Sequence, residues 1–282
     1  MYRTLIDPST LAGHLHDPEW AIVDCRFDIN DAARGAKLYS EAHIPGARYA
    51  DLDRHLSGPK TGTNGRHPLP DPDALRRDIG LLGIGPATQV VAYDADSSTY
   101  AARLWWLLRW MGHEAVAVLD GGYAHWCREG HPVRSGAEAY KTKNFQGTPR
   151  EGSSLMVLDV MNGLHHPARL LVDSRSVERY HGMNETIDKT GGHIPGAVNY
   201  FFQQNLTPEK TFKAPEELNA QWAGVLNGRE PGDLVVYCGS GVTACNNLLA
   251  LEHAGLSGAK LYPGSWSEWI ADPARPIATT ER

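Results

Sequence analysis

The turn "AHIPGA" at residues 42–47 returns as "GHIPGA" at residues 192–197, and this repetition decides how the chain is divided. Other stretches recur in the same order at a near-constant offset, from 193 − 43 = 150 residues at the histidines to 269 − 126 = 143 at the last tryptophans. These pairs are "IVDCR" (22–26) with "LVDSR" (171–175), "VVAYD" (90–94) with "LVVYC" (234–238), and "LDGGYAHW" (119–126) with "YPGSWSEW" (262–269). Four landmarks in one order indicate a duplicated domain, because self-similarity at a fixed period marks repeated structural units.

Each copy alternates short apolar runs with amphipathic stretches. In the second copy, "DLVVYC" (233–238) is short and apolar enough for a buried strand, and "TACNNLLALEHAG" (243–255) carries a helical stripe. This alternation predicts an α/β fold in which each copy is a parallel sheet flanked by helices on both faces. At 282 residues the chain is long enough for two such domains.

The segment 135–154 is polar and rich in Gly, Ser and Lys, which is typical of a connection between domains. We therefore predict a first domain over residues 1–136, a linker over 137–154 and a second domain over 155–282.

Composition and charge argue against several classes of protein. The formal net charge of −6 argues against a nucleic-acid or anionic-membrane surface, which needs clustered Lys and Arg. No apolar run approaches the roughly 18 residues that span a membrane, and the N-terminus lacks an apolar signal region, so we expect a cytoplasmic protein. The four cysteines form no CxxC pair and no cluster with His at zinc-site spacing, so neither a metal nor a disulfide scaffold is expected.

Residues shared by both copies are expected to serve the fold, because the copies share a fold without having to share chemistry. The Asp-x-Arg of residues 24–26 recurs at 173–175, so Arg175 is expected to pair with a carboxylate of its own domain. The histidines of the two repeated turns, His43 and His193, are likewise expected to be structural hydrogen-bonding groups rather than bases.

Residues found in only one copy are candidates for chemistry. Aligned without a gap, Cys238 takes the place of Asp94, and Arg179 takes the place of Asn30 at the 149-residue offset. Both differences fall in the second copy. Cys238 also ends an expected strand, and open parallel sheets bind their ligands outside the carboxyl ends of the strands. The second copy is therefore predicted to carry the active site.

The loop "CGSGVTA" (238–244) suits a nucleophilic sulfur. Gly239 and Gly241 let the backbone turn sharply and bring N–H groups inward, and a helix is expected to begin near Thr243. Loop amides and the helix dipole favour an anion, so we expect the pKa of Cys238 to be lowered and its thiolate to be the nucleophile. The alternative is a buried structural thiol, which is the expected role of Cys245.

Two other cysteine chemistries fit poorly. Cysteine-dependent phosphatases need an arginine six residues after the cysteine to bind phosphoryl oxygens, and that position here is Ala244. No stretch resembles the local signature of papain-like proteases.

The duplication, the paired HIPGA turns, the loop C-G-S-G-V-T-A and the "GSWSEW" that follows resemble the two-domain sulfurtransferases of the rhodanese superfamily. The resemblance implies two tandem rhodanese-like domains, the first catalytically silent. It also implies that the Cys238 thiolate takes a sulfane sulfur, becomes a persulfide held by amides of residues 239–243 (Gly239, Ser240, Gly241, Val242 and Thr243), and passes the sulfur to a thiophilic acceptor. No metal or organic cofactor is implied.

Within that family, Gly239 and Ser240 resemble the branch that uses 3-mercaptopyruvate, whereas the thiosulfate branch tends to carry basic residues after the cysteine. A small neutral loop is expected to leave no cation for sulfonate oxygens. Arg179 matches the arginine that binds the donor carboxylate. The second donor-binding arginine of this branch is missing from "MNETIDKTGG" (183–192), where Lys189 is the nearby cation.

The resemblance further implies a proton relay from Ser240 to a histidine and an aspartate of the first half, for which His67 and Asp53 occupy similar places. The alternative for His67 is a surface-loop histidine. For the whole protein, thiosulfate as donor and a non-catalytic persulfide carrier remain alternatives. The expected partners are a small anionic sulfur donor and an acceptor such as cyanide, a thiol or a thioredoxin-like protein.

Overall fold

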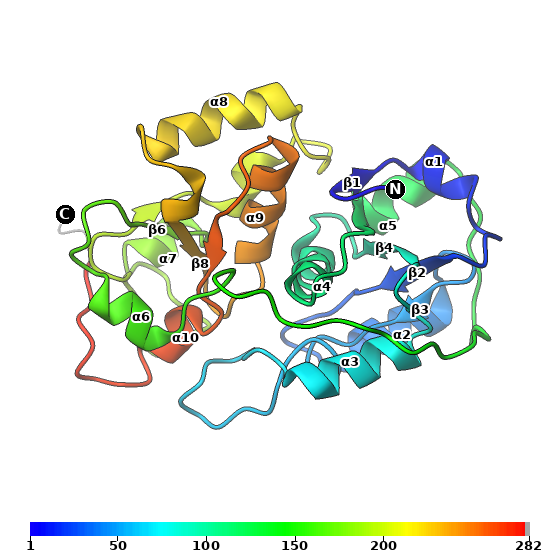
Figure 1. Ribbon diagram of the computed structural model, residues 1–282, viewed down its shortest axis with the longest axis horizontal. Helices are drawn as coiled ribbons and strands as arrows, with labels where there is room; N and C mark the ends of the chain where they lie inside the picture. Colours follow the sequence, from blue (N-terminus) through cyan, green and yellow to red (C-terminus); the bar gives the residue numbers. More distant parts are fainter. Residues whose placement is uncertain (280–282) are drawn as a thin grey trace. The chain divides into compact units, whose positions relative to one another are not determined.

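The computed structural model describes residues 1–279, and the chain forms two compact units (Figure 1). The first contains residues 1–58, 70–150 and 207–212, and the second contains residues 59–69, 151–206 and 213–282, of which 280–282 are not described. Among residues 1–279, no helix is both long and apolar enough to cross a bilayer.

The first unit is built on a five-stranded parallel sheet in the order β1-β5-β4-β2-β3. Its strands are β1 (Leu5–Ile6), β2 (Trp20–Asp24), β3 (Arg48–Tyr49), β4 (Gln89–Tyr93) and β5 (Val116–Leu119). Its helices are α1 (Pro8–Ala12), α2 (Arg34–Glu41), α3 (Pro72–Leu81), α4 (Thr99–Trp110) and α5 (Gly122–Arg128). Every residue of β4 and β5 is buried, as expected for strands covered on both faces.

The second unit repeats this plan on a four-stranded parallel sheet in the order β7-β6-β8-β9. Its strands are β6 (Leu170–Asp173), β7 (Val198–Asn199), β8 (Leu234–Tyr237) and β9 (Lys260–Leu261). Its helices are α6 (Val157–Asn162), α7 (Val177–Tyr180), α8 (Pro215–Leu226), α9 (Ala244–His253) and α10 (Ser265–Trp269), with 3₁₀ turns η1 (Phe202–Asn205) and η2 (Pro231–Asp233). The expected strand over 233–238 is β8, and the expected helix over 243–255 is α9. The predicted duplication of a parallel α/β domain is confirmed.

The repeated Asp-x-Arg stretch forms the same buried ion pair in both units. Arg26 donates to Asp24 at 2.6 Å, and Arg175 donates to Asp173 at 2.6 Å. In both units the same guanidinium also donates to the carbonyl at the start of the repeated turn, Arg26 to Ala42 at 2.6 Å and Arg175 to Gly192 at 2.5 Å. Each pair therefore ties the end of a central strand to the turn that leads to the next strand.

The two turn histidines also make matching contacts. His43 Nδ1 lies 2.7 Å from the carbonyl oxygen of Tyr39, and His193 Nδ1 lies 2.8 Å from that of Tyr180. Each imidazole stacks on the ring of the same tyrosine. These contacts agree with the expected structural role of both histidines.

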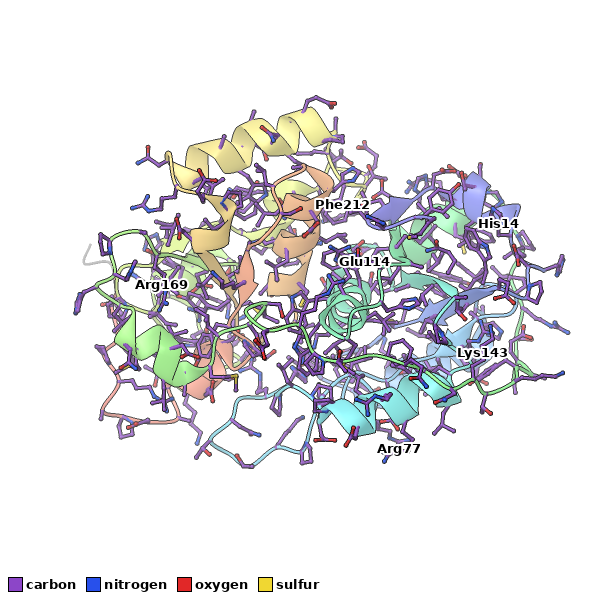
Figure 2. All side chains as sticks on the ribbon, in the orientation of Figure 1. His14, Arg77, Glu114, Lys143, Arg169 and Phe212 are labelled. Carbon is purple, nitrogen blue, oxygen red and sulfur yellow. The ribbon has the colours of Figure 1, made fainter. Side chains whose placement is uncertain are left out.

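Two segments do not group with the unit that their position in the sequence suggests. Residues 59–69, which follow β3, group with the second unit, and residues 207–212 group with the first. At the end of the latter segment, the N–H of Phe212 (labelled in Figure 2) donates to the Asp120 carboxylate at 2.8 Å. Residues 137–150 group with the first unit and, like 151–154, contain no helix or strand. The division at 1–136, 137–154 and 155–282 stays a prediction.

The buried ion pair of the first unit can be tested for its effect on stability. We expect Arg26→Met to lower the free energy of unfolding by about 3–5 kcal/mol, because it leaves the fully buried Asp24 carboxylate without its cationic partner. Urea unfolding measures the change. The control is Arg34→Met, which removes a largely exposed guanidinium 3.6 Å from Asp28 and should cost less than about 1 kcal/mol. Equal losses in the two variants would contradict the assigned role.

Candidate active site

Cys238 lies directly after β8, at the carboxyl end of the sheet, and its side chain is buried. Its N–H donates to the Ser265 hydroxyl at 3.1 Å. The carbonyls of Cys238 and Gly239 accept hydrogen bonds from the N–H groups of Trp266 (3.0 Å) and Ser267 (2.9 Å) in the first turn of α10. Residues of α10 therefore hold the backbone of both Cys238 and Gly239.

The loop that follows requires a glycine at position 241. Gly241 has φ of 73°, and a Cβ atom there would lie 2.3 Å from the carbonyl oxygen of Pro263. Within residues 1–279, the N–H groups of Gly239, Ser240 and Val242 donate to no protein acceptor. The loop before α9 thus presents backbone donors that the fold itself does not use, which is what an anion-binding loop needs.

The first copy shows what this type of loop binds. Asp94, which takes the place of Cys238, accepts hydrogen bonds from the N–H groups of Ser98 (3.0 Å), Tyr100 (2.7 Å) and Ala101 (3.1 Å). Burial raises the pKa of Asp94 to about 6, and these three bonds act against that rise. In the first unit, therefore, amides at the start of the helix hold an oxyanion where the second unit has sulfur.

Ser240 and His67 are in contact. His67 Nδ1 lies 2.8 Å from the Ser240 hydroxyl oxygen, and both side chains are buried. His67 can reach Ser240 because residues 59–69 belong to the second unit. Asp53 belongs to the first unit, where its N–H donates to the Asp51 carboxylate, and its part in the relay stays a prediction.

Arg179, on the short helix α7, is held by two carboxylates. Its Nε donates to Glu185 at 2.8 Å, and its Nη2 donates to Asp188 at 2.8 Å. Burial raises the pKa of Asp188, while the neighbouring guanidiniums lower it. Arg179 also lies beside the loop that follows Cys238, since a Cβ atom at Gly239 would be 3.4 Å from its Nη2.

Sequence reasoning missed a second guanidinium at the same place. Arg66 pairs with Asp188, and its Nη2 would lie 2.7 Å from a Cβ atom at Gly239. The loop was expected to leave no cation for sulfonate oxygens, and the structure places the Arg66 guanidinium beside it. The neighbouring position of Arg66, directly before His67, was the signal in the sequence. Lys189, expected to be the nearby cation, is exposed.

Sequence reasoning also missed Ser265, which holds the Cys238 N–H. Its φ is 56°, and the first copy has Gly122 with φ of 59° at the corresponding place. The signal available in the sequence was the alignment of Ser265 with Gly122, because glycine is the residue that most readily adopts a left-handed conformation.

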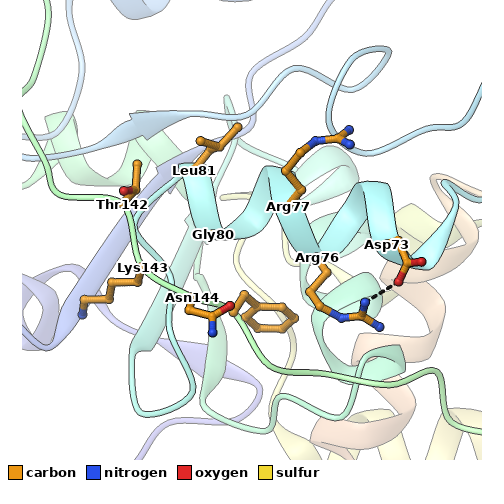
Figure 3. A pocket seen from close by; sticks show the side chains of 9 residues that line it. Asp73, Arg76, Arg77, Gly80, Leu81, Thr142, Lys143 and Asn144 are labelled. Atoms are coloured by element: carbon orange, nitrogen blue, oxygen red, sulfur yellow. Dashed lines mark hydrogen bonds and ion pairs between the residues drawn. The ribbon is translucent and has the colours of Figure 1, made fainter.

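The other cysteines lie elsewhere. Cys245 is buried within α9 and its Sγ lies 3.4 Å from the carbonyl of Gly241, in keeping with a small interior residue. Cys25 is buried and Cys127 is exposed. A cavity of about 370 Å³ beside α3, lined by residues that include Arg76 and Lys143 (Figure 3), contains none of the predicted site residues.

A model of the rhodanese-like domain matches the chain twice, over residues 7–129 and 157–272. The chain belongs to the rhodanese family. A probable 3-mercaptopyruvate sulfurtransferase of Pseudomonas aeruginosa is 44% identical over 277 residues, covering 98% of both chains. Thiosulfate sulfurtransferase of Rattus norvegicus is 34% identical, covering 96% of this chain and 93% of its own.

Solved structures agree with this assignment. SseA of Escherichia coli, described as a 3-mercaptopyruvate sulfotransferase, superimposes with a TM-score of 0.82 at 32% identity over 94% of this chain and 99% of its own. The 3-mercaptopyruvate sulfurtransferase of Leishmania major gives a TM-score of 0.84 at 29% identity, covering 95% of this chain and 74% of its own. The protein is thus a two-domain rhodanese-family sulfurtransferase, and the predicted fold and enzyme class are confirmed.

The requirement for glycine in the loop gives a test with a matched control. We expect Gly241→Ala to lower the free energy of unfolding by about 1–3 kcal/mol more than Gly255→Ala, and to slow alkylation of Cys238. Both positions have positive φ, 73° and 78°, but a Cβ atom at Gly255 would meet no atom within 4 Å. Urea unfolding and peptide-resolved mass spectrometry measure the two effects. Equal losses would show that contact with Pro263 does not constrain the loop.

Proposed function

We propose that this rhodanese-family enzyme moves the sulfur of 3-mercaptopyruvate, through a persulfide on Cys238, to a thiophilic acceptor. The observation that carries the proposal is the pairing of two features at the end of β8. Cys238 stands where the equivalent loop of the first copy binds a carboxylate with its amides, and the adjacent Ser240 contacts a buried histidine. The 44% identity to a probable 3-mercaptopyruvate sulfurtransferase supports the same donor.

In the first step, the Cys238 thiolate attacks the sulfur of the donor and forms a sulfur–sulfur bond. The carbon–sulfur bond of the donor breaks, and its electron pair passes to carbon as the enolate of pyruvate. The proton of the donor thiol moves to that enolate carbon, so pyruvate leaves and the outer sulfur remains on Cys238 as an anion. In the second step, the acceptor takes the outer sulfur and the Cys238 thiolate returns.

The neighbouring residues have separate tasks. Arg179 binds the donor carboxylate, and Ser240 moves the donor's proton with help from His67. The amides of residues 239–243, including those of Gly241, Val242 and Thr243, stabilise the anionic persulfide, because amides fixed before reaction need no reorganisation when charge arrives. Lys189, which is exposed, has no assigned task in this scheme.

Charge balance favours a donor with a single negative charge. The guanidiniums of Arg66 and Arg179 face the carboxylates of Glu185 and Asp188, so this part of the site already carries as many negative as positive charges. A monocarboxylate adds one negative charge to it and a dianion adds two.

Thiosulfate is the second candidate donor, because Arg66 places a cation beside Gly239 and a thiosulfate sulfurtransferase is 34% identical. Comparison of kcat/KM for the two donors decides between them. For acceptors we propose cyanide, small thiols or a reduced thioredoxin-like protein. Persulfide formation without repeated turnover would instead support a sulfur carrier.

The proposed nucleophile has a matched control in the same loop and helix. We expect Cys238→Ser to abolish sulfide release from 3-mercaptopyruvate in the presence of a thiol, since no thiolate remains to accept the sulfur. Cys245→Ser, which changes a buried thiol seven residues further on, should keep activity within about threefold. Mass spectrometry of the wild type should find one added sulfur on the Cys238 peptide. Donor-dependent sulfide release by Cys238→Ser would contradict the proposed mechanism.

The relay predicts a difference between donors. We expect His67→Gln to lower kcat for 3-mercaptopyruvate by about 100-fold, which is the usual size of a lost proton-transfer contribution. Thiosulfate carries no proton on its transferred sulfur, so its kcat should fall by less than about fivefold. Initial rates with both donors measure the ratio. Equal losses would mean that His67 only supports the loop.

A further inference from the structure

Two guanidiniums converge on one backbone position of the catalytic loop. A Cβ atom at Gly239, the residue after the nucleophile, would lie 2.7 Å from Nη2 of Arg66 and 3.4 and 3.7 Å from Nη2 and Nη1 of Arg179. Arg66 comes from the segment 59–69, and Arg179 comes from α7. Both belong to the second unit, so their meeting is a property of that unit alone.

One carboxylate holds the pair together. Asp188 binds Nη1 of Arg66 with one oxygen and Nη2 of Arg179 with the other, at 2.8 Å. The Asp188 side chain is only 3% exposed, so it is a fixed bridge rather than a surface contact. The backbone N–H of Arg66 is anchored separately, by a 3.0 Å bond to the Ser267 hydroxyl in α10.

Each guanidinium keeps donors that the fold does not use. Among residues 1–279, Nη2 of Arg66 and Nη1 of Arg179 contact no acceptor, and Nε of Arg66 is buried without a hydrogen-bond partner. Both guanidiniums are ion-paired, but their unused N–H groups next to the loop can still donate to an anion, and planar guanidiniums suit carboxylate and sulfonate oxygens.

We propose that Arg66 is a second donor-binding residue, which forms with Arg179 a paired-guanidinium cradle for the anionic end of the sulfur donor. Arg66 thereby supplies the charge that the segment 183–192 lacks, and Lys189 is not needed for it. Asp188 is a positioning residue that keeps the two guanidiniums at one spacing. The inference rests on the proposed function for the identity of the donor, but not for the existence of the anion site.

The cradle can be measured without turnover, by comparing the rates at which iodoacetate and iodoacetamide alkylate Cys238. The thiolate displaces iodide from both reagents, and only iodoacetate carries a carboxylate. The ratio of the two rates therefore reports the attraction of an anion and cancels changes in the reactivity of the thiol. Because Cys127 is exposed, the Cys238 peptide is followed by mass spectrometry.

We expect Arg66→Gln to lower the ratio of the iodoacetate rate to the iodoacetamide rate about fivefold to tenfold. This is the effect expected when one cation is removed from a distance of a few ångströms to a partly screened anion. Arg66→Lys should retain at least about half of the ratio of alkylation rates, since the positive charge remains and only the planar arrangement of guanidinium donors is lost. The control is Arg76→Gln, which removes an arginine paired through Nη1 with Asp73 (Figure 3) and should leave the ratio unchanged.

Steady-state kinetics then assign the donor. We expect Arg66→Gln to raise KM for 3-mercaptopyruvate about tenfold with kcat changed by less than about twofold. This pattern is expected when a residue binds the substrate equally strongly in the ground state and in the transition state. An unchanged alkylation ratio in Arg66→Gln overturns the proposal, whatever the wild type turns over. A lowered ratio in an enzyme that ignores mercaptopyruvate would leave the cradle standing and overturn the donor proposed above.

Discussion

The candidate active site depends on two backbone hydrogen bonds, from the first turn of α10 to the carbonyls of Cys238 and Gly239. They set the direction of the chain as it leaves β8, and Gly241 then has to turn in a conformation that other residues adopt only under strain. Because these constraints act on the main chain, they fix the direction of the loop amides independently of any bound ligand. The identity of the side chain at position 238 then decides what the loop does.

The first copy illustrates that separation of scaffold and chemistry. Its loop is held by α5 in the same way, with the N–H of Tyr123 donating to the carbonyl of Asp94 at 2.8 Å. The carboxylate of Asp94 satisfies the amides internally, so the first loop is closed to an outside anion. One fold has thus produced a self-capped loop in one copy and an open loop with a thiol in the other.

The internal repeat made the fold and part of the candidate site predictable from the sequence. Strand and helix patterns recur with the landmarks, and comparing the copies singled out Cys238 and Arg179, because shared residues such as the Asp-x-Arg pairs could be assigned to the fold. The roles of Arg66 and Ser265 could not be predicted from the sequence, for a physical reason. Their roles arise from contacts between segments far apart in the chain, Arg66 with Asp188 and Ser265 with Cys238, and periodicity within one segment carries no information about such contacts.

The placement of residues 59–69 has a consequence for how the gene can change. This stretch leaves the first half of the chain and contributes Arg66 and His67 to the second unit, where His67 contacts Ser240. A shortened gene that encoded only the half with the thiol would lose both side chains. The half without the Cys238 thiol therefore supplies part of the second unit, and a deletion of that half would also remove a contact of the loop after β8.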